Sequence, residues 1–515
     1  MKEVKQMGFL TTTDISKTPR PMQIKEEALV DLMLRDYLDR IFDIHEGGKT
    51  FDWTRFFTAD TEDILFRREV LTELSAHPQL VQKITDVCKC LSQIHAFQEM
   101  PVSGEFYAES IREFSVLRLA HQTMQSLYGM LDELSGAGRL QSRGLLLLKD
   151  MMKEKVATNF TADFDTHWEE LAGGLEQLGS FRVRLTMDGE LHVIGAALTH
   201  IQKERFVGSI FGARPIKELR QNEKPWDLAT LKEMKTPAEE LIRIQLSNNM
   251  KAFFQALSRI TADLTDLYDD LMFYLGALRY IRQMEKLSVP LCYPGILPEA
   301  ARGFDVQEMY NPILCVYKKS GTIPNDITFK EGGELLILTG INQGGKTTFL
   351  RAVGVTQAFF QLGWPVSCKK ASVSPVKNIV TVFSHEENTN LQHGKLGQEL
   401  KTVRAGLDIA TADSLLLCNE PITGTSPMEN LYLSREVLSA CKLQGFHGIW
   451  VTHIYDLASG AADMNRDLSG STISSLTAIA VGSGADVSAS YIIKRGEPKF
   501  TSYAKEVLRR ETGVF

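Results

Sequence analysis

The sequence predicts a protein of several domains, in which an α-helical region with a small β insert precedes an α/β domain. Three observations support this fold class. The 515 residues exceed what one hydrophobic core ordinarily organises. Apolar residues recur at helical spacing from Glu26 to about Asn159. From about Gly303 onward, short apolar runs alternate with helical patterns, which is typical of an α/β domain.

Composition indicates a globular cytoplasmic protein. Hydrophobic residues make up 43% and charged residues 23% of the chain. The sequence has no apolar run of transmembrane length, and its N-terminus lacks a signal-peptide core. Seven scattered cysteines without a C-x-x-C pair argue against a disulfide framework or a zinc site. The net charge of −7 gives no support for a dedicated nucleic-acid binder, so DNA binding needs another argument.

The first part of the chain reads as a leader and a helical domain. We expect residues 1–22 to form a flexible polar leader and residues 23–177 to form a helical core domain. Within this domain, residues 61–74 carry apolar side chains at helical spacing and stop before Pro78. A further helix is expected over residues 81–97.

The apolar period then becomes alternating in residues 178–235, which we assign to a small β insert or reduced clamp. Apolar and polar residues alternate from Phe181 to Met187, and Asp188-Gly189 supplies a tight hairpin turn.

A long helix is predicted within residues 236–300. Thr236-Pro-Ala-Glu239 combines an N-cap threonine, a proline at the first helical position and a capping-box glutamate. Apolar residues from Met250 to Ile281 then step by alternating threes and fours, a heptad seam that packs against another helix. Such a rod, on the order of 45–50 Å long, is either purely structural or a lever that transmits motion.

The α/β domain, residues 301–515, contains the most informative motif. An apolar strand ending at Leu338 runs into Gly340-Ile-Asn-Gln-Gly-Gly-Lys-Thr347, which fits the phosphate-loop pattern G-x-x-x-x-G-K-S/T without mismatch. Lys346 would reach the β/γ-phosphates and the Thr347 hydroxyl would ligate Mg²⁺. The apolar strand before and apolar helix after disfavour a chance match, so we predict a P-loop ATPase domain of the ABC type that binds ATP and Mg²⁺. The predicted nucleotide-binding residues are Gly340, Asn342, Gly344, Gly345, Lys346, Thr347 and Thr348.

Two further strands end at candidate catalytic residues. Strand 414–418 leads to Asn419-Glu420, where an acidic pair is expected to hold Mg²⁺ and orient water. Asn419 can hydrogen-bond a metal-bound water but adds no negative charge, whereas Glu420 could be a general base or only a helix-start carboxylate. Strand 448–452 leads to His453, which could sense a γ-phosphate or be structural.

Residues from about 60 to 505 resemble the MutS family of DNA mismatch-repair ATPases. The resemblance is carried by Ile323-Pro-Asn-Asp-Ile327, Thr339–Thr348, Leu415–Glu420, Gly424-Thr-Ser426, Thr452-His453, Lys494-Arg-Gly496 and Ser502-Tyr-Ala504. It implies a dimer in which each ATPase domain completes the other's site. It also implies that the helical region forms a core, a lever and a much reduced clamp around DNA.

The chain departs from the family's pattern in several places. Because the family's mismatch-reading domain has no room before residue 60, we expect a short MutS-like protein that lacks it, and we also expect it to lack the family's C-terminal helix-turn-helix. Phe97-Gln98-Glu99 matches the letters of the family's wedge, but it lies in a helical stretch and we interpret it as chance. Gly394 stands where the family's phosphate-contacting serine is expected, and Lys395 could offer a charge there instead.

We therefore expect a homodimer with slow Mg²⁺-dependent ATP hydrolysis that acts on mismatched, damaged or branched DNA, in repair or recombination, with repair-protein partners. Glu420, His453 and Asn419 are the predicted catalytic residues. Thr347 is the predicted Mg²⁺ ligand, and Asn419 is predicted to contact the ion through water. The alternative is an ATP-gated interaction or scaffold protein with little or no hydrolysis. Tyr310 and the stretch 323–326 are candidates for the adenine platform.

Overall fold

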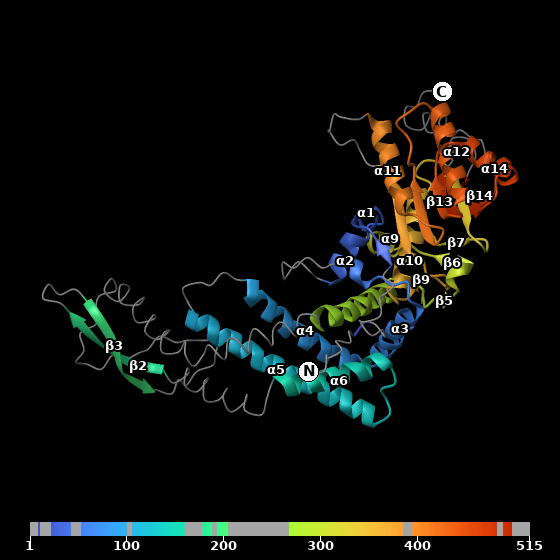
Figure 1. Cartoon of the computed structure of the whole chain (residues 1–515). Helices are drawn as coiled ribbons and strands as arrows, with labels where there is room; N and C mark the ends of the chain where they lie inside the picture. The colour runs from blue at the N-terminus through green and yellow to red at the C-terminus, as the bar shows by residue number, and fades with distance from the viewer. Residues whose placement is uncertain are drawn as a thin grey trace, which may run out of the picture. The chain divides into compact units, whose positions relative to one another are not determined.

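The computed structural model describes residues 9–10, 22–42, 53–99, 106–159, 178–187, 193–203, 267–384, 394–481 and 488–496 (Figure 1). The chain is a mixed α/β protein that divides into two compact units, which do not follow the chain order. Unit 1 contains residues 1–81, 140–147 and 270–515, and unit 2 contains residues 82–139 and 148–269. The finer domain boundaries expected from the sequence stay a prediction.

A seven-stranded sheet forms the centre of unit 1. Its strands pair in parallel except for the last, which is antiparallel to its neighbour. Parallel strands need helical crossovers, and the chain supplies a helix between most successive strands. In spatial order the strands are β1 (Gln23–Ile24), β11 (Asn378–Phe383), β12 (Ser414–Asn419), β13 (His447–Val451), β8 (Glu334–Gly340), β14 (Thr472–Val481) and β15 (Ser488–Arg495).

Helices cover both faces of this sheet, which explains why its central strands β12, β13 and β8 are buried along nearly their whole length. Alternate residues of β8, Leu335 and Ile337, pack into the core beneath one helical layer. The opposite face contacts α10 (Lys346–Gln361), where the Gly354 backbone lies close to Leu417 of β12. The first layer consists of α11 (Lys395–Ile409), α12 (Pro427–Leu443), α13 (Tyr455–Ser459) and α14 (Ala461–Asp467).

Smaller elements of unit 1 pair beside the main sheet. A four-stranded sheet has the order β5 (Gly295–Ile296), β10 (Lys370–Val373), β6 (Phe304–Met309) and β7 (Asn325–Thr328). The remaining short elements are β4 (Leu291–Cys292), β9 (Val366–Ser367), η3 (Glu299–Ala301) and α9 (Pro312–Lys318). The Asn311 side chain caps α9 by accepting hydrogen bonds from two backbone amides.

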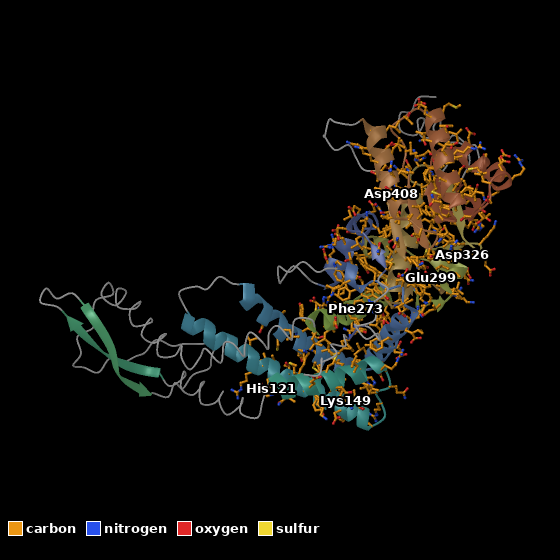
Figure 2. The ribbon with its side chains drawn as sticks, viewed as in Figure 1. His121, Lys149, Phe273, Glu299, Asp326 and Asp408 are labelled. Atoms are coloured by element: carbon orange, nitrogen blue, oxygen red, sulfur yellow. The ribbon has the colours of Figure 1, made fainter. Side chains whose placement is uncertain are left out.

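An aromatic core holds the N-terminal helices of unit 1 to the helix over residues 267–286. Phe273, labelled in Figure 2, stacks on Phe56 at 5.2 Å between ring centroids. The buried Arg67 guanidinium lies over the Phe273 ring and donates to the carbonyl oxygens of Leu10, Phe56 and Leu362. The helices that meet here are α1 (Glu26–Asp31), α2 (Leu34–Phe42), η2 (Trp53–Phe56) and α3 (Thr61–Ala76).

The segment expected to be a flexible leader contains a buried anchor at Phe9. The Phe9 side chain is fully buried and packs on Tyr274 at 4.7 Å between ring centroids. Its backbone N–H donates to Oδ2 of Asp270 at 3.0 Å. The sequence pattern held no sign of this contact, because its partners lie more than half the chain away.

Unit 2 is helical with one β hairpin. The hairpin strands pair antiparallel and place Phe181 opposite Ile201 and Leu185 opposite Ala196. The predicted turn at Asp188-Gly189 and the predicted start of the long helix at Thr236 lie outside the described residues. The elements of this part of the chain are α4 (Pro78–Glu99), α5 (Phe106–Gly136), α6 (Arg143–Asn159), β2 (Leu178–Met187) and β3 (Val193–Lys203).

The last part of the predicted heptad seam is a helix, residues 267–286. Its seam residues Leu271, Tyr274 and Leu278 are buried, but so is every other residue from 271 to 278, so the heptad seam stays a prediction. Among the helices of the described ranges, none combines the length and the apolar character that a membrane span requires.

Candidate functional site

Three parallel strands end side by side at one edge of the main sheet. β13 pairs with β12 on one side and with β8 on the other, all in parallel. Their carboxyl ends therefore meet at the same edge, where open α/β sheets place their ligand sites. This topology brings the Gly340–Lys346 loop, the Asn419-Glu420 pair and His453 together, although they are far apart in sequence.

The loop between β8 and α10 has a backbone that only particular residues allow. Gly340 has φ 132°, and a Cβ there would lie 2.7 Å from Cβ of Ala478. Gly345, with φ 86°, precedes the first residue of α10. Lys346 is buried, and its Nζ donates to the carbonyl oxygens of Gly340 and Ile341, each at 3.0 Å. Burial lowers the pKa of Lys346, and the negative charge of Glu420 opposes that shift.

The two predicted metal-serving side chains touch each other. The Thr347 hydroxyl, in the first turn of α10, donates to Oδ1 of Asn419 at 3.1 Å, at the end of β12. A hydroxyl oxygen and an amide oxygen therefore lie together beside the loop, and both are hard oxygen ligands of the kind Mg²⁺ accepts directly or through water.

Glu420 and His453 form a second pair at the same edge. The Nε2 atom of His453 lies 2.6 Å from Oε1 of Glu420. Glu420 has φ 50°, a left-handed conformation that is uncommon outside glycine, and its N–H donates to the carbonyl oxygen of Val451 at 3.0 Å. Burial would raise the pKa of Glu420, but the hydrogen bond and charge of His453 and the charge of Lys346 outweigh it and lower that pKa. The carboxylate is thus ionised at neutral pH.

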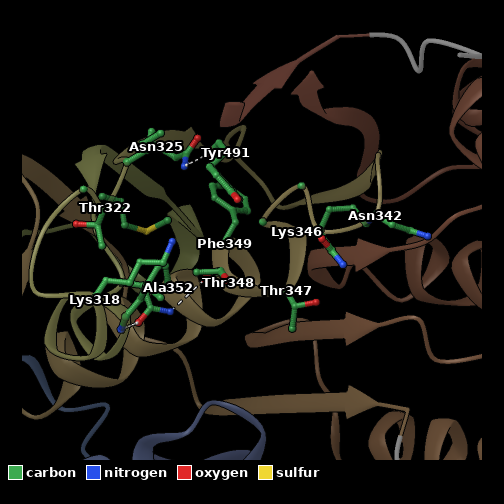
Figure 3. A pocket seen from close by; sticks show the side chains of 18 of the residues that line it. Lys318, Thr322, Asn325, Asn342, Lys346, Thr347, Thr348, Phe349, Ala352 and Tyr491 are labelled. Carbon is green, nitrogen blue, oxygen red and sulfur yellow. Dashed lines mark hydrogen bonds between the residues drawn. The ribbon is translucent and has the colours of Figure 1, made fainter. Parts of the chain in front are cut away.

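A cavity of about 470 Å³ opens beside the loop (Figure 3). It is lined by the loop residues, by Glu420 and His453, and by side chains from α9, β7 and β15. The Asn325 amide nitrogen donates to the carbonyl oxygen of Tyr491 at 3.0 Å, and Asn325 Oδ1 accepts from the N–H of Ile493 at 2.6 Å. The Lys318 ammonium lies 5.3 Å from the centroid of the Tyr491 ring.

These wall residues were only partly predictable. Ile323 and Asn325 line the cavity and belong to the 323–326 stretch proposed as an adenine platform. The other candidate, Tyr310, is not among the described residues that line it. Lys318 and Tyr491 belong to no predicted motif. They meet because the Asn325 side chain on β7 bonds to the backbone of β15, which places the Tyr491 ring beside Lys318 at the end of α9.

The segment that begins α11 is tied to the loop after Glu420. Glu399 is buried, and its carboxylate accepts from the Thr423 N–H at 2.9 Å, the Thr423 hydroxyl at 2.6 Å and the Gly424 N–H at 2.8 Å. Gly394, at the N-cap of α11, is exposed, and a Cβ there would meet no described atom within 4 Å. The start of this helix therefore offers backbone, and not a side-chain hydroxyl, to the solvent.

Two family descriptions match the chain. Residues 59–287 match the MutS2 N-terminal domain, and residues 336–509 match MutS domain V. The second match contains the loop, both residue pairs and Glu399, so the site described above lies inside the matched domain.

Several curated proteins are similar to the chain. DNA mismatch repair protein MSH2 of Saccharomyces cerevisiae is 26% identical over 259 residues, which are 47% of this chain and 27% of that protein. Endonuclease MutS2 of Thermus thermophilus is 26% identical over 164 residues, 32% of this chain and 21% of that protein. DNA mismatch repair protein MutS of Methanothrix thermoacetophila is 30% identical over 136 residues, 26% of this chain and 16% of that protein. The similarity thus spans about a quarter or less of each relative's length.

Proposed function

Because this chain belongs to the MutS family, we propose that it binds ATP with Mg²⁺, hydrolyses it slowly, and uses the nucleotide state to govern its action on DNA in mismatch repair or recombination. One observation carries the proposal. Lys346, Thr347 and Glu420 meet at the edge where β8, β13 and β12 end. This proximity of the three side chains supports the proposal independently of the resemblance in sequence.

The loop and the cavity suit a nucleotide triphosphate. The cavity volume of about 470 Å³ falls within the range of small-molecule sites. Lys346 donates only to carbonyl oxygens of its own loop, so its ammonium can turn to the β- and γ-phosphates without breaking an ion pair. The N-terminus of α10, preceded by Gly344 and Gly345, offers backbone N–H groups to the same phosphates.

We assign the metal and the water to the two residue pairs. Thr347 would hold Mg²⁺ and Asn419 would hold one of its waters, while the ion itself would neutralise charge on the phosphates. Glu420, kept ionised, would orient the attacking water, and His453 fixes that carboxylate from the other side. The exposed side chains of Ile323 and Tyr491 would form the wall for the adenine ring.

We further propose a homodimer in which each subunit approaches the other's nucleotide through the exposed start of α11, with Lys395 as the available charge. The names of the relatives, DNA mismatch repair protein and endonuclease, support DNA as the substrate class. Repair proteins are the partner class we expect.

The decisive experiment measures ATP affinity and DNA affinity on the same samples of the full chain. Lys346→Ala should weaken ATP binding by at least about tenfold, about 1.4 kcal/mol, because it removes a charge-assisted phosphate contact. Lys370→Ala, an exposed lysine on β10, is the matched control. Unchanged ATP affinity in Lys346→Ala would refute the site. Absence of DNA binding at low salt, with and without ATP, would refute the DNA assignment.

A second candidate is an ATP-gated interaction protein that hardly hydrolyses ATP. Two observations favour it: Asn419 adds no charge where a carboxylate is expected, and Gly394 offers no hydroxyl. Phosphate release under saturating ATP and Mg²⁺ separates the candidates. Turnover that DNA does not change, and that Glu420→Gln does not lower, would favour the second.

A further inference from the structure

A second cavity of about 540 Å³ lies in unit 1 and shares no lining residue with the first. Its walls come from α2, from the helix over residues 267–286 and from α9. Four cationic side chains line it, and we call it the basic cavity. These side chains are Arg40, Arg279, Arg282 and Lys286.

The charge of the basic cavity is locally uncompensated. Among the described residues that line it there is no aspartate or glutamate. The whole chain carries a net charge of −7, so a group of four cations does not follow from its overall composition. Arg282 and Lys286 are exposed, and within the described residues neither side chain has a hydrogen-bond or ion-pair partner. Unpaired cations gathered around a hollow favour an anionic ligand.

The walls of the basic cavity are fixed by hydrogen bonds between its elements. The hydroxyl of the buried Tyr37, on α2, donates to Oε1 of Gln283 at 3.0 Å. Arg279 Nη1 donates to the carbonyl oxygen of Ile41 at 2.8 Å, which holds its guanidinium at the wall. The Arg40 guanidinium lies 5.5 Å from the centroid of the Tyr317 ring, which is 53% exposed. The cations therefore project from elements that hydrogen bonds hold together.

The spacing of the cations points to a polymer. Arg279, Arg282 and Lys286 stand at positions i, i+3 and i+7 of one helix, so they follow one face over roughly 10 Å. Duplex DNA carries one phosphate per strand about every 3.4 Å of helix axis, so a row of that length can meet more than one phosphate of a nucleic-acid strand. The row is longer than a single phosphate group needs.

We propose that the basic cavity binds the phosphate backbone of a single nucleic-acid strand. This inference rests on the DNA binding of the proposed function and names where a strand is held. Arginine forks match phosphate oxygens in a bidentate way, and three of the four cations are arginines. The exposed Tyr317 ring beside Arg40 supplies a face on which a base can stack, which favours a single strand over a duplex.

The test uses the full chain and a fluorescent oligodeoxythymidine strand of about 30 nucleotides, long enough to span the roughly 10 Å row of cations. Arg282→Glu and Lys286→Glu should each weaken strand binding by about tenfold at low salt. Each should also reduce the slope of log affinity against log salt by about 0.7, the value for one lost phosphate contact. Lys370→Glu carries the same charge change on β10, outside the basic cavity, and should leave both quantities unchanged. Tyr317→Leu should reduce the preference for the strand over the matching duplex.

The outcomes separate this inference from the proposed function. If the native chain binds the strand and both charge reversals leave affinity and salt slope unchanged, the basic cavity is not the strand site, while the proposed function stands. Displacement of the strand by a poly-glutamate peptide at equal charge concentration would assign the basic cavity to an acidic protein instead. If the native chain binds neither strand nor duplex, the DNA assignment itself fails.

Discussion

The hydroxyl of Thr347 donates a 3.1 Å hydrogen bond to the side-chain oxygen of Asn419. This bond joins the start of α10 to the end of β12. An amide can accept it as well as a carboxylate does, so local geometry is preserved. What the amide lacks is a negative charge beside the proposed Mg²⁺ position.

Asn419→Asp should raise Mg²⁺-dependent ATP turnover by about tenfold, which corresponds to about 1.4 kcal/mol in the barrier. The side chain is nearly isosteric, and only the charge beside the metal changes. Phosphate release at saturating ATP measures the effect, with Asn419→Ala as the control that removes the acceptor. Unchanged or lower turnover in the aspartate variant would show that the amide does not limit hydrolysis.

Glu420→Gln should lower turnover by at least about 100-fold and leave ATP affinity nearly unchanged, because a general base or water-orienting carboxylate acts in the reaction and not in binding. Since His453 and Lys346 lower the pKa of Glu420, turnover of the native chain should stay level at neutral pH and fall only in acid. Isothermal titration with ATP, paired with a pH series of phosphate release, tests both statements. Equal losses of binding and turnover would contradict them.

Buried His447 should make the protein acid-sensitive. Burial lowers the pKa of His447 to about 4, and its Nδ1 donates to the carbonyl oxygen of Ala412 at 3.3 Å. Below about pH 6.5 His447 is protonated in the unfolded chain but stays neutral in the folded chain, so the free energy of unfolding decreases as the pH falls toward 4. The loss reaches about 3 kcal/mol near pH 4. In urea unfolding, the free energy of unfolding of the native chain should therefore fall by that amount relative to that of His447→Gln between neutral pH and pH 4. Parallel pH curves for the two proteins would contradict the assignment.

Arg495→Met should destabilise unit 1 by about 3 kcal/mol, because it leaves a buried carboxylate without its main partner. Glu334, at the start of β8, is 0% exposed and accepts from both Nη atoms of Arg495, at 2.8 and 2.5 Å. Lys330, at 3.6 Å, compensates in part. Lys494→Met, an exposed neighbour on the same strand, is the control. A difference of less than about 1 kcal/mol between the two variants in urea unfolding would refute the role of this ion pair.

The central strands of the main sheet were predictable from local pattern. β8 and β12 each contain an uninterrupted apolar run, Leu335–Leu338 and Leu415–Cys418, and both are buried on both faces, so these runs can be recognised without distant contacts. The ends of these strands then fix which residues meet, which is why Lys346, Glu420 and His453 could be assigned to one site before any coordinates.

The non-local contacts could not be predicted in the same way. β1 pairs with β11 through only two residues, Gln23 and Ile24, and its partner lies more than 350 residues later. β14 begins within a stretch rich in Ser, Gly and Ala, and it is a strand because it pairs with the buried β8 and not because of its composition. The role of Glu399 likewise could not be predicted from the sequence, since its three hydrogen-bond donors lie in the loop after β12.

The short helix α9 belongs to both cavities. Leu314 and Lys318 line the cavity beside the phosphate loop, whereas Ile313, Val316 and Tyr317 line the basic cavity. A ligand that displaces this two-turn helix in one cavity must reshape the other. By thermodynamic reciprocity, each ligand then changes the affinity of the other by the same factor. Tighter binding of a strand in the presence of nucleotide would therefore be matched by equally tighter nucleotide binding in the presence of a strand.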